Sequence, residues 1–154
     1  MAPTTYRFGD QLIPPEQVFI SRKHIYAMVY VKAIVPGHVL VCPIRQVQHF
    51  RDLTELETLE LFVCAKEIAN KFKDFFKVKS FNFLIQDGDQ SGQQTKHVHL
   101  HIIPREDTQS SVGQMKLNVV TERSPIDMAE EADTLRQFFE KRDEIVQFNQ
   151  SSYI

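Results

Sequence analysis

Three histidines stand at alternate positions in the segment KHVHLHIIPR: His97, His99 and His101. On a β-strand, residues two apart point to the same face, with their Cα atoms about 6.6 Å apart. The alternation therefore predicts that the three imidazoles share one face, where they can act together on one ligand. The residues between and after them are apolar and suit the opposite, packed face: Val98, Leu100 and Ile102.

Three imidazoles on one face are compatible with three kinds of surface. The first is a solvated polar face without chemistry. The second is a zinc site, since open catalytic zinc sites use three protein ligands; a further ligand would come from His38, His49 or Cys42. The third is attack on phosphorus, because an imidazole with a pKa near 6.5 is largely neutral and nucleophilic at pH 7. The strand pattern alone does not choose among them.

Phosphoryl chemistry would give the imidazoles distinct tasks. A nucleophilic imidazole forms a covalent phosphoramidate, which divides the displacement into two steps. A neighbouring imidazole donates to a phosphoryl oxygen or to the leaving group. The loop before the histidines, DGDQSGQQTK, suits such a ligand, because Gly88 and Gly92 permit tight turns whose backbone N–H groups point at phosphate oxygens. The loop therefore favours an anion-binding site.

Four segments rich in β-branched and aromatic residues are predicted as strands. The first two flank Pro36-Gly37, a turn signal, and so predict an antiparallel hairpin with His38 at the start of its second strand. Pro104 is expected to end the last strand. The four predicted ranges are 26–35, 38–44, 79–86 and 97–103.

Two further segments repeat apolar residues at helical spacing. The first, residues 52–76, begins with a capping box formed by Thr54 and Glu57. The second begins at Ser124-Pro125, an N-cap followed by proline at the first helical position. Strands combined with two helices predict an α+β fold in which helices cover an antiparallel sheet. The expected apolar stripes are Leu59, Phe62, Ala65, Ala69, Phe72 and Phe76 in the first helix, and Met128, Ala132, Leu135 and Phe139 in the second.

Length and composition indicate one globular domain over residues 1–154. Within it we expect a core over about 6–105, a mobile loop over 106–123 and a C-terminal helix over 124–148. A net charge of −2 argues against a nucleic-acid partner, which needs a basic face. No apolar run reaches membrane-spanning length and no signal segment opens the chain, so a cytoplasmic or nuclear location without membrane contact is expected. Cys42 and Cys64 lie in apolar runs and are expected in the core, with a disulfide or metal pair as the alternative.

Several segments together resemble a known family. HVHLH followed by apolar residues, the preceding GQQTK, and PGHVLVCP some sixty residues upstream are similar to the histidine triad (HIT) superfamily. The chain most resembles the fragile histidine triad branch, the Fhit-like diadenosine triphosphate hydrolases. YRFGDQLI near the start and RSPIDMAEEADTLRQFF near the end also match this branch in order, so the resemblance covers roughly residues 6–139.

The resemblance implies a bis(5'-adenosyl)-triphosphatase that cleaves a dinucleoside polyphosphate such as Ap3A at its α-phosphate, giving AMP and ADP. By position, His99 would be the nucleophile that forms a nucleotidyl-histidine intermediate. His101 would contact the α-phosphate, His97 would support the strand, and His38 would be a fourth histidine beside the nucleophile. Gln86 and Gln93 would hold phosphate oxygens, Gly92 would shape their loop, and the residues lining the nucleoside pocket would be Phe8, Met28 and Leu40.

The resemblance also implies a homodimer whose sheets join across a two-fold axis. No tightly bound cofactor or metal is expected on the histidines; a divalent cation, Mg²⁺ or Mn²⁺, would accompany the substrate's phosphates. Two positions depart from the family. Tyr30 replaces the Asn or Asp that binds ribose hydroxyls, and tyrosine cannot make the same bidentate contact. Gln94 replaces a Ser or Thr, although Thr95 follows and can substitute for it.

Two alternative functions remain open at this point. One is a nucleotide-binding sensor in which turnover is slow and the liganded form carries the signal. The other is a hydrolase of the same superfamily that acts on nucleoside phosphoramidates or other nucleotidyl substrates. Base preference and polyphosphate length are not determined by the sequence, nor is whether residues 106–123 close over the site.

Overall fold

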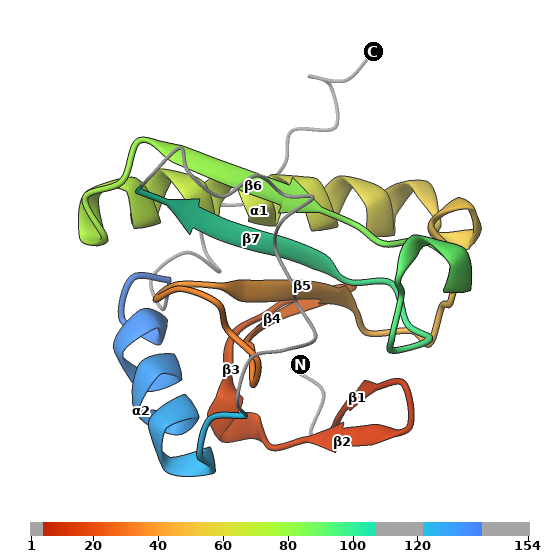
Figure 1. Ribbon diagram of the computed structural model, residues 1–154. Coiled ribbons are helices and arrows are strands. Elements are labelled where there is room, and N and C mark those ends of the chain that lie inside the picture. Colours follow the sequence, from red (N-terminus) through yellow and green to blue (C-terminus); the bar gives the residue numbers. More distant parts are fainter. Residues whose placement is uncertain (1–4, 107–121, 140–154) are drawn as a thin grey trace.

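The computed structural model describes residues 5–106 and 122–139 (Figure 1). An antiparallel five-stranded sheet in the order β3-β4-β5-β7-β6 forms its centre, which confirms the predicted α+β class. The strands of this sheet are β3 (Val18–Ser21), β4 (Ile25–Val29), β5 (Val39–Pro43), β6 (Ser80–Leu84) and β7 (Leu100–Arg105). The remaining elements are the β1–β2 hairpin (Tyr6–Phe8 and Gln11–Ile13), the helices α1 (Glu55–Phe75) and α2 (Pro125–Arg136), and the short 3-10 turns η1 (Pro15–Gln17), η2 (Phe50–Asp52) and η3 (Asp89–Ser91).

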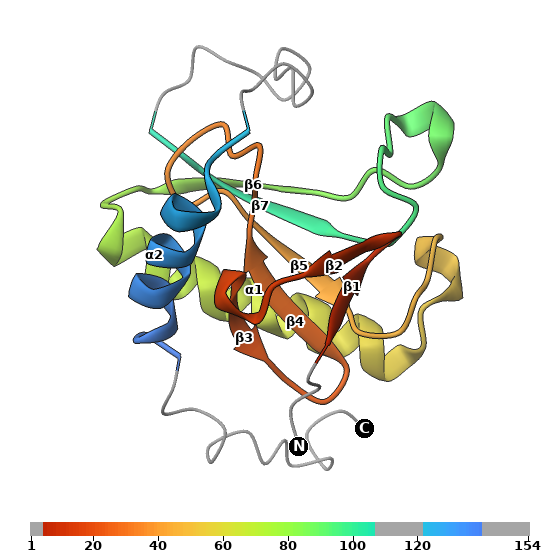
Figure 2. The same cartoon turned by 90° about the horizontal axis from the view of Figure 1, so that it is seen from below.

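The two faces of the sheet are covered by different elements. On one face α1 lies across β5 and β7, and α2 lies against β3 and β4 (Figure 1). Side chains from both helices join one core with alternate residues of the strands, including Val39 and Leu100. On the other face the β1–β2 hairpin lies against the sheet (Figure 2), and a smaller cluster contains Phe8, Tyr26 and Leu40. The alternation along each strand therefore divides the molecule into a helix side and a hairpin side.

The predicted hairpin of β4 and β5 is confirmed, but the first strand is shorter than predicted. β4 ends at Val29, and the chain then turns, with the N–H of Ala33 donating to the carbonyl of Tyr30 at 3.2 Å. The strand signal in residues 31–35 is overridden because the chain must reverse before His38. Branched residues in this segment fill partly buried positions of a turn instead of a ladder.

The histidine strand is displaced along the sequence from its predicted position. β7 begins at Leu100 and continues through Pro104 to Arg105, so the prediction that Pro104 ends it was wrong. β5 pairs only with residues up to Ile102, so Pro104 has a neighbouring strand, β6, on one side alone. A proline without N–H is tolerated at such an edge position. His97 precedes the strand in a bend, with its N–H donating to the carbonyl of Thr95 at 2.8 Å.

Helix α1 begins as predicted but presents a different face to the sheet. The predicted stripe was wrong in part: Phe62 is 44% exposed, and Leu59, Ala69 and Phe76 are only partly buried. Two apolar stripes run along this helix, and packing against the sheet decides which is buried. The buried residues are Glu57, Leu61, Cys64, Ala65, Ile68 and Phe72.

Helix α2 has the predicted N-cap, in which the Ser124 hydroxyl accepts from the N–H of Asp127 at 3.1 Å. Its buried positions Met128, Ala132 and Leu135 agree with the predicted stripe. The helix ends at Arg136 and a turn follows to Phe139, so it is shorter than the predicted 124–148. Residues 140–148 and most of the predicted loop over 106–123 lie outside the described part of the chain.

Both cysteines are buried and free, which confirms their place in the core. They cannot pair, because Cys42 belongs to the hairpin-side cluster and Cys64 to the helix-side core. Among the residues described here, no helix is long and apolar enough to cross a membrane.

The capping box at the start of α1 yields a first prediction. Thr54 Oγ1 accepts from the N–H of Glu57 at 3.1 Å, and the Glu57 carboxylate accepts from the N–H of Thr54 at 2.8 Å. Thr54→Ala should lower the free energy of unfolding by about 1 kcal/mol, measured by urea denaturation. Thr58→Ala is the matched control, since the Thr58 hydroxyl donates only to the carbonyl of Thr54, and should change stability by less than about 0.5 kcal/mol. Equal losses in both variants would contradict the capping role.

Candidate active site

The histidines gather on the hairpin side of the sheet, where β5 and β7 pair. His101 lies opposite Leu40 in this pairing, and both point to the hairpin side. The predicted face for the histidines is therefore confirmed, although only His101 lies within β7 itself. His38, the residue directly before β5, lies beside them. All four side chains are buried: His38, His97, His99 and His101 are each at most 5% exposed.

His38 and His101 form a directed hydrogen-bonded pair. The N–H of Ile34 donates to Nδ1 of His38 at 3.2 Å, so Nδ1 is the acceptor and the proton of the neutral ring lies on Nε2. That Nε2 is 2.9 Å from Nδ1 of His101 and donates to it. The remaining proton of His101 then lies on its Nε2, a buried atom that has no partner among the described residues. The pair thus ends in an unused N–H donor.

His97 and His99 are oriented by backbone groups, and only His99 carries its proton on Nδ1. The N–H of Val47 lies 3.4 Å from Nδ1 of His97, and Nε2 of His97 donates to the carbonyl of Pro43 at 2.9 Å. Both nitrogens of His97 are therefore occupied. Nδ1 of His99 lies 2.7 Å from the carbonyl of His97 and must carry the proton to donate there. Nε2 of His99 consequently presents a lone pair, as a nucleophile requires.

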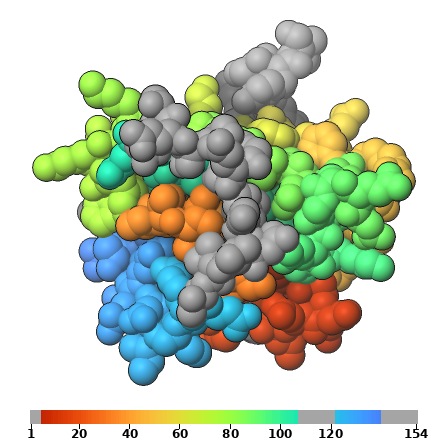
Figure 3. Space-filling model, viewed as in Figure 1, coloured from red at the N-terminus to blue at the C-terminus, as the bar shows by residue number. Residues whose placement is uncertain are grey.

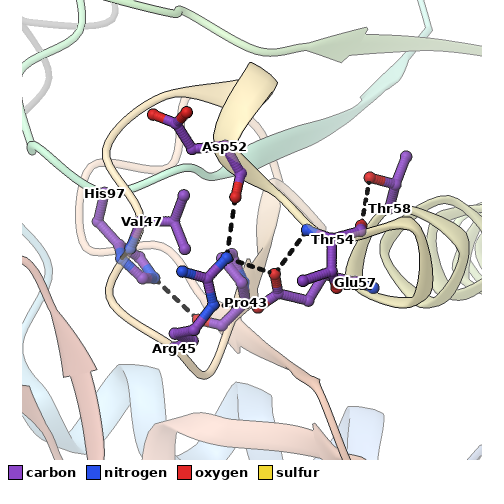
Figure 4. Close-up of polar contacts among 8 residues, drawn as sticks. All are labelled: Pro43, Arg45, Val47, Asp52, Thr54, Glu57, Thr58 and His97. Atoms are coloured by element: carbon purple, nitrogen blue, oxygen red, sulfur yellow. Dashed lines mark hydrogen bonds and ion pairs between the residues drawn. The ribbon is translucent and has the colours of Figure 1, made fainter.

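The segment that holds His97 is braced by a buried carboxylate (Figure 4). Arg45 donates to both oxygens of Glu57, at 3.2 and 2.8 Å, and also to the carbonyl of Asp52 at 2.9 Å. Glu57 is 3% exposed, and its hydrogen bonds with Arg45 and Thr54 lower the pKa of its carboxyl against the opposing effect of burial. These contacts tie residues 43–47 to the N-terminus of α1. They thereby hold the carbonyl of Pro43 and the N–H of Val47, the two groups that orient His97.

Burial keeps all four imidazoles neutral. Desolvation lowers the pKa of His38 to about 3, of His97 to about 4 and of His101 to about 2, and nearby imidazoles add to the effect. The pKa of His99 is also lowered by burial, against the opposing hydrogen bond to the carbonyl of His97. Neutral rings have one donor and one acceptor nitrogen each, which is the condition for the tautomers assigned above.

The loop before the histidines is built around two glutamines. Gln93 is 7% exposed; its Oε1 accepts from the N–H of Gly88 at 2.8 Å and its Nε2 donates to the carbonyl of Gln48 at 3.1 Å. Its amide is thus engaged within the protein. Gln86 donates to the carbonyl of Ser91 at 3.2 Å and still reaches the cavity. Gly92 has φ +93°, and a Cβ there would lie 2.7 Å from Nε2 of Gln86, so glycine is required.

A cavity of about 110 Å³ lies where the histidines, the hairpin and this loop meet. Figure 3 shows the hairpin (red) and the loop (green) close together on one side of the surface. His99 and His101 both line the cavity, whereas His38 and His97 do not. Of the other predicted site residues, it is lined by Phe8, Tyr30, Gln86, Gln94 and Thr95, and it also includes Gln11, Val31, Lys32 and Glu122.

A second, more apolar cavity of about 410 Å³ adjoins the first and shares Phe8, Gln11, Tyr30, Val31 and Glu122 with it. Met28 lines this larger cavity, as predicted for a pocket residue. Leu40 lines neither of these two cavities and is fully buried in the hairpin-side cluster, so its contact with a nucleoside stays a prediction. Phe8 lines both cavities and packs edge-on against His99, with ring centroids 5.0 Å apart.

Several residues of the site carry no signal in the sequence. Gln11, Lys32 and Glu122 enter the cavities because the hairpin, the turn after β4 and the start of α2 converge there. Arg45 donates to the carbonyl of Asp52 and to the carboxylate of Glu57. Arg123 donates to the carbonyl of Tyr30. The part of the chain described here holds no group of three or more His, Cys, Asp or Glu side chains placed as metal ligands.

The fold and the site together define an α+β protein in which hydrogen-bonded histidines lie beside a glycine-glutamine loop. The family model of the HIT domain matches residues 12–108, and the chain belongs to this family. The bifunctional bis(5'-adenosyl)-triphosphatase/adenylylsulfatase FHIT of Arabidopsis thaliana is 44% identical over 102 residues, which are 66% of this chain and 57% of that protein. The bis(5'-adenosyl)-triphosphatase of Dictyostelium discoideum is 38% identical over 143 residues, covering 90% of this chain and 95% of the relative.

A solved structure gives the same result for the fold. The diadenosine triphosphate hydrolase of Plasmodium falciparum in complex with cyclomarin A superimposes with a TM-score of 0.79 at 29% identity. The superposition covers 92% of this chain and 88% of that one. The predicted HIT-like fold and the resemblance to the fragile histidine triad branch are therefore confirmed.

The lowered histidine pKa values predict an acid-sensitive fold. In the unfolded chain each histidine has a pKa near 6.5. As the pH falls below this value, the unfolded state therefore binds more protons than the folded state and is favoured. Stability is fully present above pH 6.5 and should decline between pH 6.5 and about 4, with a slope that approaches about 1.4 kcal/mol per pH unit for each of His38, His97 and His101. Urea denaturation at several pH values measures this slope, and His97→Asn should make it shallower. A free energy of unfolding that stays constant across this range would refute the neutral-histidine assignment.

Proposed function

We propose that the protein is a dinucleoside polyphosphate hydrolase that cleaves substrates such as diadenosine triphosphate to AMP and ADP. The observation that carries this proposal is the pairing of the His99 Nε2 lone pair with the unused N–H donor of His101 on the wall of one cavity. A nucleophile and a donor so placed suit displacement at phosphorus. The names of the Arabidopsis, Dictyostelium and Plasmodium relatives support this substrate class.

In the proposed mechanism, Nε2 of His99 attacks the α-phosphorus and forms a P–N bond. The P–O bond to the β-phosphate breaks, and ADP leaves with its electron pair. The His99 ring then carries positive charge, which the carbonyl of His97 at its Nδ1 stabilises. The N–H of His101 donates to an oxygen of the reacting phosphate. Water next attacks phosphorus, the P–N electron pair returns to Nε2, and AMP leaves with the added hydroxyl while the second proton of the water passes to solvent.

The two adjoining cavities support a division of the substrate between them. The small cavity, lined by His99, His101 and Gln86, would hold the reacting phosphate. The larger cavity, with Phe8 and Met28 on its wall, would hold a nucleoside. A divalent cation, Mg²⁺ or Mn²⁺, would arrive on the substrate's phosphates and not on the histidines, because three of the four imidazole nitrogens on His97 and His99 are occupied.

We also propose that the protein is a homodimer joined through β6. This strand is at the edge of the sheet and pairs only with β7 among the described strands. Phe83 projects from it and is 49% exposed. An uncovered edge strand with an apolar side chain can pair with a second copy.

The two free buried cysteines support a reducing compartment, cytoplasm or nucleus, as the place of this activity.

A trapped intermediate tests the proposed reaction. The protein is mixed with diadenosine triphosphate labelled at the α-phosphate and stopped in alkaline denaturant, in which a phosphoramidate survives. We expect protein-bound label that acid releases as AMP, and no label in His99→Asn. His49→Asn is the control, because His49 pairs with Asp87 outside the cavity and should retain the label. Label in His99→Asn would overturn the assignment. A rate of hydrolysis much slower than the rate of nucleotide dissociation would favour a signalling role.

The dimer is tested separately by light scattering after size exclusion. The wild-type protein should have twice the mass of the chain, whereas Phe83→Glu should place a charge on the joined edge and reduce the mass to that of one chain. Ile126→Glu is the matched control, since Ile126 on α2 is 70% exposed and α2 contacts β3 and β4, at the other end of the sheet from β6. A monomeric wild-type protein, or a dimer that survives Phe83→Glu, would refute this interface.

A further inference from the structure

Arg123 ties the start of α2 to the segment that follows β4. Its Nε and Nη2 both donate to the carbonyl of Tyr30, at 3.2 and 2.7 Å, and its backbone N–H donates to the carbonyl of Val31 at 3.0 Å. On its other side, Nη1 contacts the carboxylate of Glu131 on α2 at 2.9 Å. Figures 1 and 2 both place the start of α2 beside this segment. The planar guanidinium therefore clamps Tyr30 to the helix.

Tyr30 in turn contacts the pair of histidines that ends in the unused donor. Its ring lies edge-on to His38 and His101, with ring centroids 4.8 and 5.4 Å apart. It also lines both cavities. The position that departs from the family is thus filled by a side chain that packs on His38 and His101 and lines both cavities.

The backbone of the same segment sets the proton positions in this pair. The N–H of Ala33 also donates to the carbonyl of Tyr30, at 3.2 Å, and the next N–H, that of Ile34, donates to Nδ1 of His38. His38 closes the turn by donating its backbone N–H to the carbonyl of Val35 at 3.2 Å. A shift of the Tyr30 carbonyl therefore displaces the donor that assigns the tautomer of His38, and through it the tautomer of His101.

We propose that Arg123 is a positioning residue: it holds Tyr30 against His38 and His101 and so maintains the orientation in which His101 presents its Nε2–H donor at the cavity. This inference rests on the proposed hydrolase function. Arginine suits the task better than lysine, because its planar fork places two donors on one carbonyl while a third meets a carboxylate. The charge of Arg123 also helps to keep the His38 ring neutral. Burial is the largest cause of the lowered pKa of His38, and the positive charge of Arg123 is the next.

The test compares Arg123→Gln with Arg136→Gln. Arg136 is a matched control on the same helix: its Nη2 donates to the carbonyl of Val18 at 2.9 Å and its Nη1 contacts Asp133, remote from the histidines. Both variants remove one anchor of α2, so both should lower the melting temperature. Only Arg123→Gln should reduce kcat for diadenosine triphosphate, by roughly tenfold or more, with little change in KM, because a small misplacement of a reacting group costs up to about a hundredfold.

A second measurement needs no turnover. Nitrogen-15 spectra of the histidine side chains in the ligand-free protein report the tautomer of each ring. We expect single tautomers, protonated on Nε2, for His38 and His101 in the wild type and in Arg136→Gln, and mixed tautomers in Arg123→Gln. Arg123→Lys, which keeps the charge and one donor, should show a smaller loss of kcat and serves if Arg123→Gln fails to fold.

Unchanged tautomers in the Arg123 variants, an unchanged kcat, or an equal loss of kcat in Arg136→Gln would overturn the positioning role. If the wild type does not hydrolyse diadenosine triphosphate, the proposed function fails, but the spectra still decide whether Arg123 orients the histidine pair. The two failures are therefore distinguishable.

Discussion

The neutrality of four buried imidazoles is the constraint on which the site depends. A neutral ring has one donor and one acceptor nitrogen, so each hydrogen-bond partner also decides where the proton lies. The carbonyl of His97 leaves a lone pair on His99, while the N–H of Ile34, acting through His38, leaves a donor on His101. Two chemically identical side chains thereby acquire opposite roles because backbone groups, which cannot titrate, hold them.

Much of the surrounding fold positions these backbone groups. The register of β5 and β7 sets Leu40 opposite His101, and the brace between Arg45 and Glu57 holds the segment that contacts His97. Gln93 is buried and fastens the preceding loop through both atoms of its amide. On the other side, Arg123 and Tyr30 connect helix α2 to the same imidazoles. The scaffold thus reaches each histidine through a short chain of polar contacts.

The predictions from sequence succeeded where the physical cause is local. The capping box of Thr54 and Glu57, the N-cap at Ser124 and the hairpin at Pro36-Gly37 follow from residue types within a few positions, and the structure contains all three. Predictions failed where packing decides, as for the buried face of α1 and the start of β7. For Leu40, strand alternation predicts the side of the sheet, whereas its complete burial depends on side chains from other elements.

Spacing alone determined that three histidines share a face, and the motifs around them determined the family, because both are properties of contiguous residues. Tertiary structure decided what each histidine can do. The tautomer of His101 depends on the ring of His38, 63 positions away, and that of His97 on a carbonyl 54 positions away. The cavities form where the hairpin, the loop and the segment before α2 converge. In the sequence, Tyr30 is only a departure from a family pattern. In the folded chain it contacts Arg123, His38 and His101, which are distant from one another in the sequence, so no short segment predicts these contacts.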